Sequence, residues 1–213
     1  MNRGFRHFLG PIFGLFCAIG AAQAHPHVWV TMTSEVVYAP DGSVTGVRHA
    51  WAFDDMFSAF ATQGIETKQK GVFTREELAP LAQVNVDSLK ESDYFTYAKA
   101  NGEKALFNGP TDYWLEYKDN VLVLHFTLPF KSPVKAQHLD LEVYDPTYFV
   151  DFELAENDPV KLVNAPSHCE LTVVRATDAT ASNVPVNEQF FNSLDASSNW
   201  GAQFADKILV NCP

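Results

Sequence analysis

The chain has 213 residues, with 26 Asp and Glu against 15 Lys and Arg, so its formal net charge is -11. Hydrophobic residues make up 46% of the chain and charged residues 19%, which excludes an intrinsically disordered or fibrous protein. The scarcity of basic residues argues against nucleic acid as a partner, because phosphate binding depends on Lys and Arg. The same acidic balance is compatible with binding a cation.

The first 24 residues have the three parts of a secretory signal peptide. Arg3 and Arg6 form a basic start, an apolar run extends from Phe8 to Ala22, and Ala22-Gln23-Ala24 fits the cleavage pattern of small residues. The apolar run is short for a membrane span, which needs about 20 residues. We therefore expect residues 1–24 to be removed and residues 25–213 to form a single α+β domain in the periplasm.

Alternation of apolar and polar residues predicts a first hairpin over residues 28–38 and 44–53, with its turn at Pro40-Asp41-Gly42. A short helix is expected over residues 54–63. A second helix is expected from Thr74, because Thr74 and Glu77 have the spacing of a capping box.

Strand patterns return in the second half of the chain, where turns such as Asn101-Gly102 and Asp119-Asn120 separate them. The strands are predicted at residues 94–99, 104–107, 113–117, 121–128, 139–144, 148–154, 171–175 and 207–211, with a helix at 187–194. This order predicts the α+β class, with antiparallel, sandwich-like sheets and helices inserted after the first hairpin.

The predicted mature N-terminus, His25-Pro26-His27, places two imidazoles and an α-amine within three residues. Imidazole is the commonest side-chain ligand of transition metals. Pro26 has no N–H, so the square-planar chelate that recruits backbone amides is blocked. We expect the amine and ring of His25 to chelate a metal, with His27 and other ligands completing the site. The alternative is that these residues form only a polar arm.

Counting outward from Asp41 along the predicted hairpin pairs His27 with Asp55, so the two histidines and the acidic pair Asp54 and Asp55 are expected to be neighbours. A mixed imidazole and carboxylate site suits Ni, Co or Zn better than soft Cu(I). Asp54 and Asp55 have an alternative role as caps of the following helix.

Two further residues are secondary metal-ligand candidates. His49 shares one face of its strand with Trp51 and Phe53, where a buried histidine is more often a hydrogen-bonded part of the core. Asp145 precedes Pro146, and such a pair usually forms only a turn. His125 alternates with apolar residues and is interpreted as structural.

Cysteine usage predicts one disulfide. Removal of the leader takes away Cys17 and leaves Cys169 and Cys212, an even count in an exported protein. The motifs of common hydrolases, nucleotide-binding proteins and zinc proteases do not occur in the sequence, so catalytic residues are not assigned.

Four segments resemble a bacterial periplasmic family of unknown function, described as a periplasmic component of an uncharacterised transport system. They are residues 25–30, 51–58, 144–149 and 201–206, and the similarity extends over nearly all of the chain after the leader. The resemblance implies genomic association with nickel and cobalt permeases, and hence a role in transition-metal handling. It implies no reaction and no set of ligands.

The favoured hypothesis is therefore a periplasmic accessory protein that binds Ni, Co or Zn and works with a membrane metal permease. An alternative is a copper-binding redox protein or enzyme that uses the N-terminal histidine chelate. A third is a structural subunit whose exposed aromatic residues dock on a partner.

Overall fold

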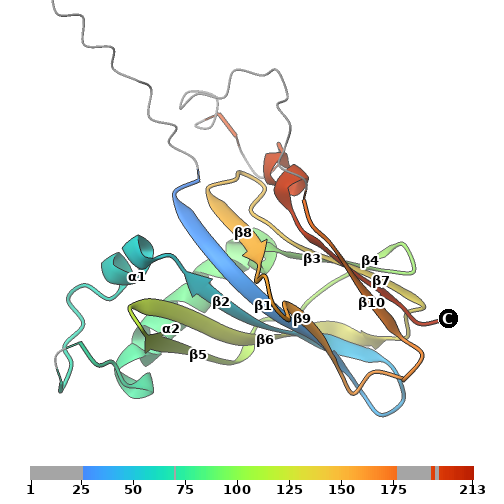
Figure 1. The fold of residues 1–213 in the computed structure, drawn as a ribbon, viewed down its shortest axis with the longest axis horizontal. Helices are drawn as coiled ribbons and strands as arrows, with labels where there is room; N and C mark the ends of the chain where they lie inside the picture. The colour runs from blue at the N-terminus through green and yellow to red at the C-terminus, as the bar shows by residue number, and fades with distance from the viewer. Residues whose placement is uncertain (1–25, 70, 177–192, 195–196) are drawn as a thin grey trace, which may run out of the picture.

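The computed structural model consists of two β-sheets that pack against each other, with two α-helices at one side (Figure 1). It describes residues 26–69, 71–176, 193–194 and 197–213. Apolar side chains from both sheets meet in one hydrophobic core. The predicted α+β class with sandwich-like sheets is confirmed.

The first sheet has the strand order β5-β6-β2-β1-β8, and β9 also pairs with β1. Its strands are β1 (Val28–Tyr38), β2 (Val44–Phe53), β5 (Thr111–Lys118), β6 (Val121–Val134), β8 (Val150–Leu154) and β9 (Val160–Val163). Most pairs are antiparallel, as expected, but β8 and β9 run parallel to β1. The alternation pattern carried no sign of these parallel pairs, because periodicity reports which face a residue occupies and not which strand lies beside it.

The second sheet has the strand order β10-β11-β7-β3-β4. Its strands are β3 (Thr96–Ala100), β4 (Glu103–Ala105), β7 (His138–Val143), β10 (Glu170–Val174) and β11 (Lys207–Asn211). Residues 187–192 of the predicted last helix lie outside the described residues.

The helices follow the first hairpin, as the sequence predicts. They are α1 (Asp55–Ala61) and α2 (Arg75–Leu89), and two 3-10 helices also occur, η1 (Lys90–Phe95) and η2 (Trp200–Phe204). The capping box of Thr74 and Glu77 is confirmed at the start of α2. Among the described residues, no helix is long and apolar enough to cross a membrane.

Aromatic rings fill the space between the sheets. Trp51 is 1% exposed and makes edge contacts with Phe126 and Phe152, each with ring centroids 4.8 Å apart. Edge-to-face contacts of this kind add to the free energy of burying the rings. The inward face predicted for β2, with Val47, His49, Trp51 and Phe53, is therefore confirmed, since all four side chains are buried.

The predicted disulfide joins Cys169 and Cys212, which are 43 residues apart in sequence. Cys169 directly precedes β10 and Cys212 directly follows β11, so the bridge closes the end of an antiparallel pair. A loop of this length corresponds to about 4 kcal/mol of stabilisation in the chain-entropy account.

Candidate functional site

Three distant segments meet where β1 begins. The backbone N–H of His27 donates to the carbonyl of Phe149 over 2.9 Å, and the N–H of Asp54 donates to the carbonyl of Trp29 over 2.9 Å. We call the surface formed by His27, Trp29, Asp54 and Phe149 the β1 corner. It joins the start of β1, the end of β2 and the loop before β8 (Figure 1).

The hairpin brings the predicted partners together with a shift of one residue. Val30 pairs with Phe53, which places Trp29 beside Asp54, whereas the count from Asp41 places Trp29 beside Phe53. The shift arises because β2 contains an extra residue opposite the step from Val37 to Tyr38, and a bulge of this kind moves all later pairs by one.

Asp54 uses both carboxylate oxygens for structure. Oδ1 accepts the N–H of Phe57 at 2.8 Å, which caps α1, and Oδ2 accepts the N–H of Trp29 at 3.0 Å. One carboxylate therefore ties the helix to the first strand. The neighbouring Asp55 is exposed in the first turn of α1.

Asp145 organises the loop that carries Phe149. It is 5% exposed, and one oxygen accepts the N–H and hydroxyl of Thr147 while the other accepts the N–H groups of Phe149 and Val150. The loop places the ring of Phe149 against the ring of His27, with centroids 4.7 Å apart. Asp145 thus fixes the position of Phe149, and Phe149 in turn contacts His27.

A close contact holds this loop from behind. A Cβ atom on Gly201 would lie 1.8 Å from the carbonyl oxygen of Asp145, so only glycine fits there. The Gly201 N–H donates to the carbonyl of Pro146 over 3.1 Å, and the rings of Phe204 and Tyr148 stack at 4.0 Å. The segment around η2 therefore supports the β1 corner.

His49 lies between the two sheets. Its Nδ1 is 2.9 Å from the hydroxyl of Ser34, and its Nε2 is 3.5 Å from the hydroxyl of Thr96 in the second sheet. Burial lowers the pKa of His49 to about 3, so the ring is neutral at physiological pH. The structure brings His49 to the core and not to the β1 corner.

Asp151, an acid in the middle of a predicted strand, lies beside the corner but was not among the predicted metal ligands. It pairs with Trp29 across the parallel strands β1 and β8, and its Oδ2 accepts the hydroxyl of Tyr148 at 3.3 Å. Burial, and next the negative charge of Glu153, raise the pKa of Asp151 to about 6. An acid that interrupts the apolar run Val150-Asp151-Phe152 was the available signal.

His25 lies outside the described residues, so its position relative to His27 is not part of the structure. Within residues 26–69, 71–176, 193–194 and 197–213, no group of three or more His, Cys, Asp or Glu side chains is arranged to hold a metal ion.

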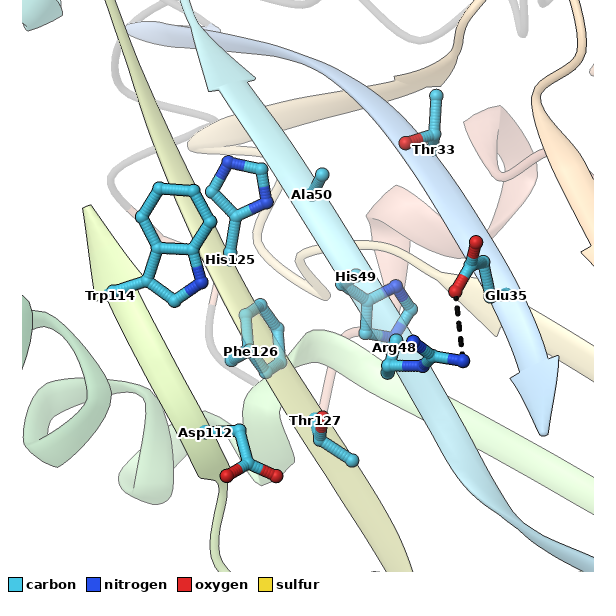
Figure 2. A pocket seen from close by; sticks show the side chains of 10 residues that line it. All are labelled: Thr33, Glu35, Arg48, His49, Ala50, Asp112, Trp114, His125, Phe126 and Thr127. Atoms are coloured by element: carbon cyan, nitrogen blue, oxygen red, sulfur yellow. Dashed lines mark ion pairs between the residues drawn. The ribbon is translucent and has the colours of Figure 1, made fainter. Parts of the chain in front are cut away.

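A pocket of about 490 Å³ lies on the outward face of the first sheet. We call it the outer-face pocket, and Figure 2 shows the ten residues that line it: Thr33, Glu35, Arg48, His49, Ala50, Asp112, Trp114, His125, Phe126 and Thr127. The side chains of His49 and Phe126 are buried on the inward face, so the other eight supply the side chains that a ligand could reach. The sequence reasoning missed this pocket, because it forms across two hairpins, β1-β2 and β5-β6, that are distant from each other in the chain.

The profile of the family described as "Protein of unknown function (DUF1007)" matches residues 11–212. The chain belongs to this family. A Haemophilus influenzae protein, named only as an uncharacterized protein, is 25% identical to this chain over 211 residues, which cover 94% of this chain and 97% of that protein.

The contacts of this DUF1007 protein explain why four separate segments carry the resemblance noted in its sequence. His27, Asp54, Asp145 and Gly201 each belong to one of those segments, and hydrogen bonds and ring contacts connect them around the β1 corner. The segments are thus parts of one structural unit.

Proposed function

We propose that this protein is a periplasmic accessory protein that binds Ni, Co or Zn at the β1 corner and works with a membrane metal permease. The observation that carries the proposal is the placement of His27. Its backbone and its ring both contact Phe149, and Asp54 and Asp151 flank Trp29, which lies two residues further along the chain.

A held imidazole is a better ligand than a free one, because less conformational entropy is lost when the metal binds. His27 supplies one nitrogen, and the amine and ring of His25 supply two more. In this proposal Asp55, which is exposed in the first turn of α1, contributes an oxygen ligand, and a mixture of imidazole and carboxylate favours Ni, Co or Zn.

The surroundings of the corner also support a protein partner. Trp29, Met56 and Phe60 are 44%, 70% and 73% exposed, a large apolar area for a surface. Residues 26–35, 49–67 and 144–156 contain acidic residues and no Lys or Arg. Such a surface suits a partner with apolar and basic side chains, which in this proposal is the permease.

The decisive experiment is a metal titration of protein whose first residue is His25. We expect one Ni, Co or Zn ion per chain, with affinity that falls as pH drops, because protons compete with the metal for the imidazole nitrogens. Replacement of both His25 and His27 by Ala should abolish binding. The matched control is His138→Ala, an exposed histidine at the start of β7.

Equal affinity in the double variant and the unaltered protein would refute the proposal. Preference for copper together with turnover in the presence of a reductant would favour the copper redox alternative. A second control retains one residue before His25, which removes the α-amine from the site and should weaken binding.

A further inference from the structure

The outward face of the first sheet is hollow at its centre. Thr33 in β1, Ala50 in β2 and Thr127 in β6 form a floor of small side chains, where an exposed sheet face usually carries long polar ones (Figure 2). The resulting volume of about 490 Å³ lies in the range of small-molecule sites.

The stacked rings of Trp114 and His125 form one wall of the outer-face pocket. The rings of Trp114 and His125 lie nearly parallel, with centroids 3.9 Å apart. The guanidinium of Arg75, at the start of α2, lies 4.6 Å from the centroid of the Trp114 ring. Nε2 of His125 is 3.3 Å from a carboxylate oxygen of Glu116. These contacts fix the wall before any ligand arrives, which lowers the entropic cost of binding.

A β-bulge turns Asp112 into the same pocket. Between Thr111 and Trp114, strand β5 has one more residue than its partner β6, and the backbone of Asp112 has a φ of 50°. Left-handed φ values are costly for residues other than glycine and persist where the fold enforces them. Bulges redirect side chains in this way beside binding sites.

Arg48 lies on the other side of Thr127 (Figure 2). Its guanidinium is 3.2 Å from the carboxylate of Glu35, and the two side chains are 47% and 37% exposed. A guanidinium has five N–H donors, so the single contact with Glu35 leaves donors for a ligand carboxylate.

We infer that the outer-face pocket binds a small zwitterion of dipeptide size, with its ammonium group at Asp112 and its carboxylate at Arg48. The strands of these two residues, β5 and β2, are separated by β6, a distance of about 10 Å between backbones. An extended dipeptide spans about 7 Å, which fits between side chains that project from those strands. The body of the ligand lies on Ala50 against the ring of His125.

The test uses L-alanyl-L-alanine as the probe and NMR chemical shifts of the Trp114 indole N–H and the Ala50 amide as the readout. We expect saturable shifts at both groups. Acetylation of the probe's amine, or amidation of its carboxylate, should each weaken binding by about tenfold or more, since each removes a charged hydrogen-bonding group.

Variants show which end of the probe each residue binds. In Asp112→Asn the acetylated and free probes should bind equally, and in Arg48→Gln the amidated and free probes should bind equally. The matched controls are Asp119→Asn, an exposed acid in the turn of the same hairpin, and Lys99→Gln, an exposed base in β3. Both should bind like the unaltered protein.

Absence of shifts at millimolar probe, or shifts that persist unchanged in both pocket variants, would overturn the inference. Metal binding at the β1 corner does not enter this test, so its outcome is independent of the function proposed above.

Discussion

The two faces of the first sheet differ although the same strands build them. On the inward face, Trp51 and Phe126 pack in edge contact, and both nitrogens of His49 have hydroxyl partners. On the outward face, the neighbouring Ala50 forms the floor of a pocket beside His125. Residues one position apart along β2 therefore have opposite surroundings.

The difference shows that the inward face of this sheet stabilises the fold and that the outward face is open to a ligand. On the inward face the rings of Trp51 and Phe126 are buried against each other and the nitrogens of His49 have partners, so these residues act on stability. The outward face carries aromatic and charged side chains that are partly exposed to solvent, and a ligand can reach them.

The largest expected effect comes from removing a ring on each face. Trp51→Ala should lower the free energy of unfolding by about 3–5 kcal/mol, because it leaves a cavity between the sheets. Trp114→Ala should lower it by only about 1–2 kcal/mol, since this ring is partly exposed. Urea unfolding of both variants measures the difference, and equal losses would contradict the comparison.

Acid should destabilise the inward face through His49. The folded-state pKa of about 3 lies below the ordinary 6.5, so this contribution to stability is complete above pH 6.5 and declines as pH falls toward 3. Between pH 7 and pH 5 the loss is about 2 kcal/mol. Urea unfolding should show it in the unaltered protein and in the His138→Gln control. A dependence that persists in His49→Gln would contradict this assignment.

The contribution of Asp151 to the free energy of unfolding should depend on pH in the opposite direction to that of His49, and it should be smaller. Its pKa is raised to about 6, so the folded state disfavours the carboxylate and loses stability as pH rises from about 4 through 6. Asp151→Asn should therefore stabilise the protein at pH 8, by about 1 kcal/mol after allowance for solvent screening, and should have little effect at pH 4. Destabilisation at pH 8 would show that the charged form is favoured.

The smallest effect concerns the ion pair of Glu35 and Arg48 on the outward face. Because both side chains are exposed, Glu35→Gln should change the free energy of unfolding by about 0.5 kcal/mol or less. Thermal unfolding at low and high salt measures this. A decrease in the free energy of unfolding above about 2 kcal/mol would mean that the ion pair stabilises the fold, and Arg48 would then be unavailable to a ligand.

Much of the fold was predictable because local patterns agree with the tertiary structure. The hairpin of β1 and β2, the capping box at Thr74 and the pairing of Cys169 with Cys212 are all confirmed. β9 was missed, because a four-residue strand that pairs in parallel has little alternation of its own.

The candidate sites were predictable only in part. The sequence shows that His27 and the acidic pair Asp54 and Asp55 lie at the ends of one hairpin. The register between them depended on a bulge in β2, which adds one residue without a distinctive sequence signal. The roles of Asp145 and Gly201 depended on a contact between chain segments more than 50 residues apart.

Local chemistry and periodicity by themselves thus determined the fold class, the faces of the strands, the first helix caps and the disulfide, since each follows from residues close in sequence or from cysteine count. Tertiary structure decided that His49 is a core residue, that Asp145 holds Phe149 against His27, and that Arg48, Asp112 and His125 surround one pocket. The physical reason is that these roles arise from strand order and register, which bring together side chains that no sequence spacing connects.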